Sequence, residues 1–345
     1  MCNIAGYVGE RDAAPILIKM IKQQEGFNGG YYTGIATLHE GKLYYEKLTG
    51  DTDYLTSHTR AASLPGKIGI IHSRTRSGGG DEWAHPFVGM HGDAPFCAYV
   101  ANGGVGCYKG CAQEYNEMAQ ALLDEGYPLA SQIQIDPPAY TQLRDGSSVH
   151  MSDVMCQMIL RQMEKEPDPA TAMANAFCEM PSEIVGLLLS LDAPDRIIYS
   201  RFNMPMSVAF AAHGAYLASS PLAFPADARE HALLMANSSG YVFRDRFTTL
   251  PMQAPPMPVA AITADLRARA YHAAIKTLKE KEMTYAEVSR LVISPLFEEE
   301  APRPVAALTY DTLLALKKRG LLKERLEMRE GVFPHLTAPK VMLSI

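Results

Sequence analysis

The residue best suited to do chemistry is Cys2, which directly follows the first methionine. Methionine before a small side chain is commonly removed, and Cys2 then offers a thiol and a free α-amino group together. An α-amino group has a pKa of about 8, so it can take the proton of the thiol and return it to a leaving amine. The sequence therefore predicts a nucleophile and its base at Cys2; the alternative is a small apolar residue that starts an edge strand.

A second group of polar residues lies in the segment 66–87, which begins with an apolar run. Arg74 ends the predicted strand, and its planar guanidinium can bind a carboxylate through two hydrogen bonds. Gly78, Gly79 and Gly80 follow and can form a loop that closes over a ligand. The same residues are also consistent with a solvated arginine and a flexible turn.

The third candidate is the pair Asn102-Gly103, which follows another apolar run. Asn-Gly is a strong hairpin-turn signal, so a turn is one interpretation. The other is catalytic. The Asn102 side-chain amide and the Gly103 backbone N–H are two donors that could stabilise an oxyanion, as acyl transfer from an amide requires.

The elements around these residues indicate two sheets with helices outside them. In the first 250 residues, four segments show helical periodicity, and nine short runs rich in β-forming residues are predicted as strands. The predicted helices are 12–25, 110–125, 151–165 and 168–179. The predicted strands are 2–8, 33–39, 42–48, 67–74, 96–102, 183–192, 195–201, 206–211 and 214–218. Six methionines between 151 and 180 are interpreted as core filler.

The 345 residues predict two domains, residues 1–250 and residues 259–345, joined by a Pro-rich linker at 251–258. The C-terminal part shows three helical segments and then two short β-like segments, which is the order of a winged-helix module. Its predicted helices are 262–281, 284–293 and 309–319. The second begins with a capping box, Thr284 with Glu287 three residues later.

Composition and net charge indicate which classes of partner the chain is unsuited to bind. The chain is 47% hydrophobic and 20% charged with a net charge of −6, which predicts a globular protein whose partner is neither nucleic acid nor an anionic membrane. No apolar run approaches the roughly 20 residues of a membrane span, and no secretion signal is evident, so we expect a cytoplasmic protein with six reduced cysteines. Cys107 and Cys111 have no partners at zinc spacing, so we expect no metal and no cofactor.

Taken in order, five short segments resemble the class II glutamine amidotransferases, and most closely the glutaminase domain of glucosamine-6-phosphate synthase. They are Cys2-Asn3-Ile4-Ala5-Gly6, Gly34-Ile35-Ala36, His72-Ser73-Arg74, His85-Pro86 and Asn102-Gly103. The resemblance covers about residues 2–245 and implies an α+β fold, the four-layer αββα sandwich of the N-terminal nucleophile hydrolases, followed here by the small helical, winged-helix-like module.

The resemblance also implies roles for individual residues. Cys2 is the nucleophile that attacks the glutamine side-chain amide, and Asn102 with Gly103 forms the oxyanion hole. A glutamyl thioester forms, ammonia leaves and water releases glutamate. Arg74 holds the substrate α-carboxylate with help from Ser77, and His85 shapes the pocket. The carboxylate that binds the substrate α-amino group is assigned to Asp153.

Three positions depart from the family pattern. Thr75-Arg76-Ser77 follow the arginine where an aromatic residue and Ala-Thr are usual, and Asn28 stands where an arginine is expected. The simplest register places Met151 at the acidic position, so Asp153 does this job only after a shift of two residues. Asn28 in place of the arginine bears on how the loop supports Cys2. The position of the acidic residue bears on selectivity for glutamine.

The leading hypothesis is a glutaminase that passes ammonia to a separate acceptor synthase subunit, because residues 259–345 are too few for a sugar isomerase domain and show no phosphate-binding glycine loop. Two alternatives stay open. One is a stand-alone hydrolase of a larger γ-glutamyl amide, and the other is a catalytically weak sensor or scaffold. A homo-oligomer is compatible with all three.

Overall fold

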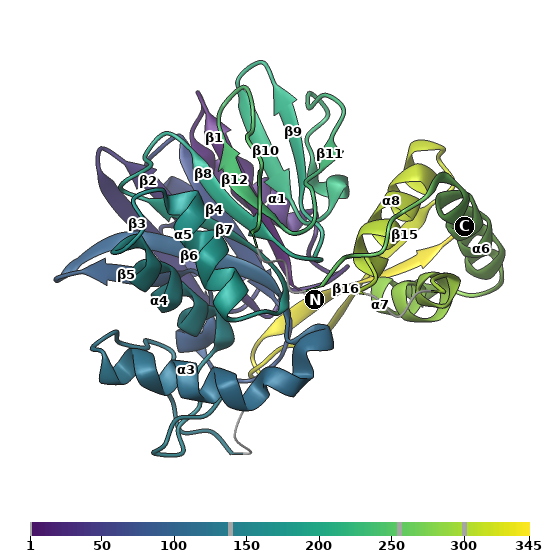
Figure 1. The fold of residues 1–345 in the computed structure, drawn as a ribbon. Helices are drawn as coiled ribbons and strands as arrows, with labels where there is room; N and C mark the ends of the chain where they lie inside the picture. Colours follow the sequence, from purple (N-terminus) through teal and green to yellow (C-terminus); the bar gives the residue numbers. More distant parts are fainter. Residues whose placement is uncertain (1, 137–140, 254–256, 299–301) are drawn as a thin grey trace.

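The computed structural model describes residues 2–136, 141–253, 257–298 and 302–345. Two large antiparallel sheets stack face to face, and helices cover the outer side of each sheet (Figure 1). A smaller module of helices and a hairpin lies beside this sandwich. The arrangement is the four-layer αββα architecture that the sequence resemblance implies.

The first sheet has seven strands in the order β11-β9-β10-β1-β4-β2-β3. Its strands are β1 (Asn3–Gly9), β2 (Tyr32–His39), β3 (Lys42–Thr49), β4 (Ile68–Arg74), β9 (Ser207–Ala211), β10 (Gly214–Ala218) and β11 (Ala232–Leu233). Helices α1 (Ala13–Lys22) and α2 (Thr52–His58) pack on its outer side. Strand β1 lies between β10 and β4, so the residue that precedes it is held at the centre of the sheet.

The second sheet has six strands in the order β13-β12-β8-β7-β6-β5. Its strands are β5 (Phe87–His91), β6 (Ala94–Gly104), β7 (Glu183–Ser190), β8 (Ile197–Arg201), β12 (Ser238–Val242) and β13 (Leu250–Pro251). Outside it lie α3 (Ala112–Asp124), α4 (Met151–Met163) and α5 (Pro169–Glu179). All six methionines between 151 and 180 belong to this layer's core, which confirms their interpretation as core filler. Met163 is partly buried, and the other five are buried: Met151, Met155, Met158, Met173 and Met180.

Between the two sheets lies a core of small and branched apolar side chains from both. Ile4 and Val8 of β1 face Val100 of β6 and Leu187 of β7 in this layer. Because side chains alternate along a strand, each sheet contributes its inner row here and packs its other row against helices. This packing fixes the start of β1 against the end of β6.

Helix α2 and strand β5 are not predicted from the pattern of the sequence. Helix α2 has only seven residues, and its signal is the N-cap Asp51, whose side chain accepts a hydrogen bond from the Tyr54 N–H. Strand β5 has five residues, and its register shifts between Gly89 and Met90. Elements this short give too little periodicity to read.

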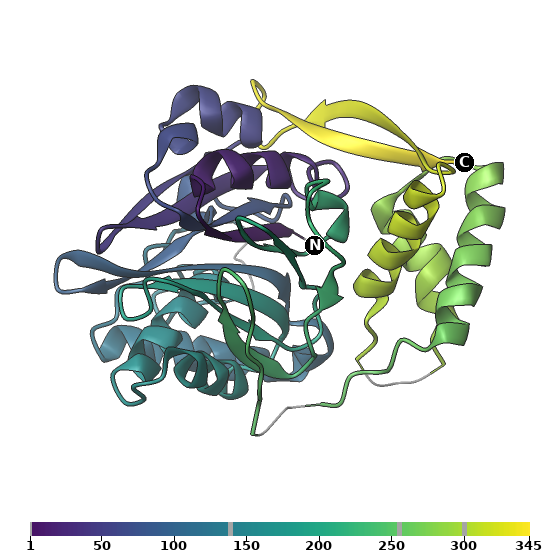
Figure 2. The same ribbon diagram turned by 90° about the horizontal axis from the view of Figure 1, so that it is seen from above.

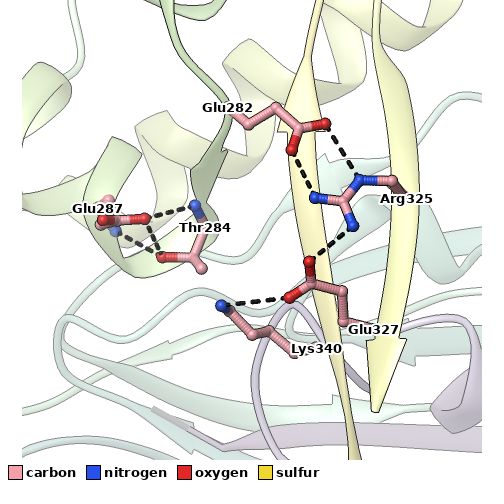
Figure 3. Close-up of polar contacts among 6 residues, drawn as sticks. All are labelled: Glu282, Thr284, Glu287, Arg325, Glu327 and Lys340. Carbon is pink, nitrogen blue, oxygen red and sulfur yellow. Dashed lines mark hydrogen bonds and ion pairs between the residues drawn. The ribbon is translucent and has the colours of Figure 1, made fainter. Parts of the chain in front are cut away.

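The C-terminal module has its own core. It consists of α6 (Ala264–Glu280), β14 (Met283–Thr284), α7 (Tyr285–Glu287), α8 (Val305–Lys318), β15 (Lys323–Glu330) and β16 (Thr337–Ser344). The capping box is confirmed, since Thr284 and Glu287 bond each other through side chain and backbone (Figure 3). Helix α7 continues as a π-helical turn over Val288–Ile293, and α8 begins four residues before the predicted start because Pro304 precedes it.

The hairpin β15–β16 reaches from the module to the sandwich (Figure 2). Arg325 of β15 bonds Glu282, the residue before β14, and also Glu327 of its own strand (Figure 3). Glu327 in turn pairs with Lys340 of β16, so charged side chains link the hairpin strands to each other and to the start of β14. Within the described residues, no helix is long and apolar enough to cross a membrane.

Candidate functional site

A cavity of about 250 Å³ opens where the start of β1, the end of β4 and the end of β6 meet. Both sheets contribute to its wall, together with the first turn of α4. Its polar lining residues are Cys2, Arg74, Thr75, Ser77, His85, Tyr99, His150, Ser152 and Ser182. Glycines and apolar side chains, including Gly103 and Gly104, line the remainder. The cavity is therefore large enough for a small substrate and has donors on several sides.

Cys2 lies at this wall with its thiol partly exposed and free of any disulfide. Its Sγ is 3.8 Å from the Thr75 Oγ1, and its backbone nitrogen donates to the Asn102 Oδ1 at 2.9 Å. Asn102 belongs to the second sheet, so the bond joins the two sheets at the predicted nucleophile. The same oxygen is placed to hold the α-amino group of Cys2 when Met1 is removed.

Asn102 and Gly103 lie inside strand β6, paired with Val185 and Ile184 of β7. The interpretation of this pair as a hairpin turn is therefore wrong. Gly103 has a φ of +133°, and a Cβ added there would lie 2.0 Å from the Glu183 carbonyl oxygen. Only glycine fits this backbone. Because the Asn102 oxygen accepts from Cys2, its Nδ2 is the atom of the side chain that can donate.

Arg74 is the last residue of β4 and is 2% exposed, so the alternative of a solvated arginine is wrong. Its guanidinium lies 4.5 Å from the Tyr32 ring centre and 5.5 Å from that of Trp83, and its Nη1 donates to the Gly78 oxygen at 3.0 Å. Two aromatic faces hold the planar group in place. Arg74 thus presents a fixed cation to the cavity. The glycine loop is hydrogen-bonded to it through the Gly78 carbonyl oxygen.

Three buried histidines lie beside the arginine. The ring centres of His72 and His85 are 3.8 Å apart, and those of His85 and His150 are 5.2 Å apart. Burial, and then the charge of Arg74, lowers the pKa of His72 to about 3. Burial also lowers the pKa of His85 and of His150 well below the ordinary value. All three rings are neutral at neutral pH, so His85 shapes the wall without adding charge.

The sequence-predicted residues fall into two groups. Cys2, Arg74, Ser77, His85 and Gly103 line one cavity, and Asn102 bonds Cys2 beside it. Asp153 is fully buried outside the lining, where its Oδ2 accepts from the Ser131 N–H at 2.8 Å and from the Ser131 hydroxyl at 2.7 Å. Burial raises the pKa of Asp153. The structure thus brings six of the seven predicted residues together and places Asp153 behind them.

Five of the nine polar lining residues are not predicted from the sequence: Thr75, Tyr99, His150, Ser152 and Ser182. Thr75 contacts the sulfur of Cys2, and its only sequence signal is that it stands where the resembling family has another residue type. His150 is the N-cap of α4, and its Nδ1 accepts from the Ser152 N–H at 3.1 Å. A histidine is an uncommon cap, so propensity gives no reason to single it out.

Metal ligands are not gathered anywhere in the part of the chain that the structure describes. Cys107 and Cys111 are both free thiols there.

The fold and the site together define a class. Two antiparallel sheets stacked between helical layers, with a cysteine at the start of a central strand facing a buried asparagine and glycine, are the architecture of the N-terminal nucleophile hydrolases. Within that fold class, the chain resembles the class II glutamine amidotransferases, and the comparisons with known proteins confirm both the fold and the resemblance.

The curated relatives are glutamine–fructose-6-phosphate aminotransferases. The protein from Pyrococcus horikoshii is 26% identical over 250 residues, which are 72% of this chain and 37% of that protein. The protein from Zymomonas mobilis is 26% identical over 223 residues, which are 65% of this chain and 32% of that protein. The chain thus spans about a third of the length of these relatives.

Among solved structures, the glutamine phosphoribosylpyrophosphate amidotransferase from B. subtilis aligns with a TM-score of 0.61 at 14% identity, over 94% of this chain and 66% of that one. The allosteric regulatory enzyme of purine biosynthesis aligns with a TM-score of 0.60, also at 14% identity. At this identity the likeness concerns the fold. No protein-family model matches the chain.

Proposed function

We propose that this chain hydrolyses the side-chain amide of glutamine through a thioester on Cys2 and releases glutamate and ammonia. The observation that carries the proposal is the cavity shared by Cys2, Arg74 and Gly103. A nucleophile, a carboxylate-binding cation and an oxyanion donor are the three groups that this reaction needs at one site.

In the proposed mechanism, Arg74 binds the α-carboxylate of the substrate and so directs its side-chain amide toward Cys2. The sulfur attacks the amide carbon, and the carbonyl oxygen gains a negative charge that the Gly103 N–H and the Asn102 Nδ2 stabilise. The C–N bond breaks, and ammonia leaves with the proton from the thiol. Water then attacks the thioester, glutamate departs and the thiol is restored.

The proposed base is the α-amino group of Cys2 itself, which requires removal of Met1. The nitrogen of Cys2 is held at 2.9 Å by the Asn102 Oδ1, so its position at the cavity wall is fixed. His72, His85 and His150 are poor alternatives, because burial lowers the pKa of each and none is in hydrogen-bond contact with Cys2 among the described contacts.

The test is glutamate release from L-glutamine by purified protein whose intact mass shows loss of Met1. We expect turnover that falls to background in Cys2→Ala. Cys107→Ala is the matched control, because this thiol is exposed and lies outside the cavity. Equal turnover in Cys2→Ala and the unaltered protein would refute the mechanism. Labelling of Cys2 by a glutamine-analogue electrophile separates an active site from a catalytically dead scaffold.

The position of Asp153 supports a second candidate, a hydrolase of a γ-glutamyl amide that lacks a free α-ammonium group. This carboxylate bonds Ser131 and does not line the cavity. Comparison of L-glutamine with N-acetyl-L-glutamine distinguishes the two. Faster turnover of the acetylated amide supports the second candidate, and a strong preference for L-glutamine supports the first.

We also propose that the ammonia is used by an acceptor synthase on a separate subunit. The similarity to the curated relatives covers about a third of their length, so most of each relative has no counterpart in the matched segment. Product formation by a candidate synthase with this chain, supplied with glutamine or with ammonium, tests the idea. If the synthase forms its product from ammonium, and glutamine together with this chain does not increase product formation, the idea is contradicted.

A further inference from the structure

Asn28, which replaces the arginine of the resembling family, contacts the C-terminal module. It is 7% exposed, and its Nδ2 donates to the hydroxyl oxygen of Tyr310 at 2.9 Å. Tyr310 lies on α8, 282 residues further along the chain. The loop around the nucleophile is therefore hydrogen-bonded to a different domain.

Asn3, the residue after Cys2, completes the connection. Its Nδ2 donates to the Asn28 carbonyl oxygen at 2.7 Å and to the Gln24 carbonyl oxygen at 2.9 Å, and its Oδ1 accepts from the Tyr310 hydroxyl at 3.5 Å. Asn3 is completely buried. Tyr310 thus bonds both asparagines, and one of them is covalently joined to the nucleophile.

Tyr310 is held firmly by its own domain. Its ring stacks on Tyr285 with centres 4.5 Å apart, and the capping box of Thr284 fixes the turn that carries Tyr285. Burial, followed by the nearby Cys2, raises the pKa of Tyr310, so its hydroxyl stays protonated and able to donate. The tyrosine is a rigid, neutral bridge.

Strand β16 of the module holds the same loop from a second direction. The Val341 N–H donates to the Gly26 carbonyl oxygen at 2.9 Å, and Phe27 is buried in the core of the module. Gly26 has a φ of +90°, and a Cβ there would lie 2.8 Å from the Val341 Cγ2. Figure 2 shows the hairpin of β15 and β16 extending from the module to the sandwich.

We propose that Tyr310 is a positioning residue for Cys2, and that the C-terminal module therefore completes the glutaminase site. This inference rests on the proposed function. Loss of the Tyr310 hydroxyl leaves Asn28 and Asn3 with unpaired buried polar atoms, and the start of β1 can then shift. A small displacement of a nucleophile lowers the rate of its reaction strongly without removing any group that binds substrate.

The test compares Tyr310→Phe with Tyr271→Phe. Both changes remove one hydroxyl from the module, but the hydroxyl of Tyr271 accepts from Arg319 on the module's own surface. Two rates are measured: glutamate release from L-glutamine, and alkylation of Cys2 by iodoacetamide, followed by peptide mass. We expect Tyr310→Phe to lower kcat and the alkylation rate about 10-fold, with KM within about 2-fold, and Tyr271→Phe to change neither.

A double variant separates positioning from general destabilisation. If Tyr310 acts through Asn28, the loss of kcat in Asn28→Ala with Tyr310→Phe does not exceed that of the larger single variant. Equal rates in Tyr310→Phe and Tyr271→Phe overturn the proposal. Multiplied losses in the double variant overturn the route through Asn28 and leave the bond between Tyr310 and Asn3 as the contact that positions Cys2. If the unaltered protein releases no glutamate but Cys2 alkylation still slows in Tyr310→Phe, the proposed function fails and the positioning role holds.

Discussion

Glu25 makes the stability of this protein depend on pH. The carboxyl is buried beside the loop that supports Cys2, and it accepts from the Ser73 hydroxyl at 2.7 Å and from the Thr52 N–H at 3.1 Å. Burial raises its pKa from the ordinary value of 4.5 to about 7, and these hydrogen bonds only partly offset that effect. The folded state therefore prefers Glu25 in its neutral form.

The difference between the folded and unfolded pKa values of Glu25 sets the sign and size of the change in unfolding free energy with pH. Below pH 4.5 the carboxyl is largely neutral in both folded and unfolded chains and costs little. Between pH 4.5 and about 7 the unfolded chain releases the proton while the folded chain still holds it, so stability falls; above about 7 the folded chain buries a charge that the unfolded chain solvates, and the loss is complete. Each pKa unit is worth about 1.4 kcal/mol, so about 3 kcal/mol of stability is lost between about pH 4.5 and about pH 8.

Glu25→Gln mimics the neutral acid and should remove this loss. Urea unfolding of both proteins at pH 4.5 and pH 8 gives the free energies, and the gain of Glu25→Gln over the unaltered protein should be about 3 kcal/mol larger at the higher pH. The buried histidines are present in both proteins, so their contributions cancel. Glu117→Gln, an exposed position on α3, is the control. A difference that is the same at both pH values would show that Glu25 is solvated or paired in the folded state.

Two further substitutions test the cavity itself. Gly103→Ala should lower kcat by about 100-fold or more and also lower Tm, because the added Cβ collides with the Glu183 carbonyl oxygen and displaces an oxyanion donor. Gly110→Ala is the control, because a Cβ there meets nothing within 4 Å and the residue lies outside the cavity lining; equal loss in both variants would argue against the oxyanion role. Arg74→Lys keeps the charge but loses the fork that can hold a carboxylate in two places, so KM for glutamine should rise about 10-fold with a smaller change in kcat; steady-state kinetics showing an unchanged KM would count against carboxylate binding by Arg74.

The sequence by itself determined the local features of this protein. Cys2, Arg74 and Asn102-Gly103 are visible as residue types at the ends of predicted strands, and alternation and periodicity located most strands and helices, because these signals depend on near neighbours. The capping box at Thr284 is local in the same sense. Elements as short as α2 and β5 lack the periodicity that such reasoning needs.

Only the tertiary structure decided which distant residues meet. The turn interpretation of Asn102-Gly103 could be rejected only once β6 was seen paired with β7, and the solvated interpretation of Arg74 only once Tyr32 and Trp83 were seen around it. The same holds for Asn28 and Tyr310, which are 282 residues apart and lie in the loop after α1 and on α8. No local pattern encodes such a contact, because it arises from the packing of one domain against the other.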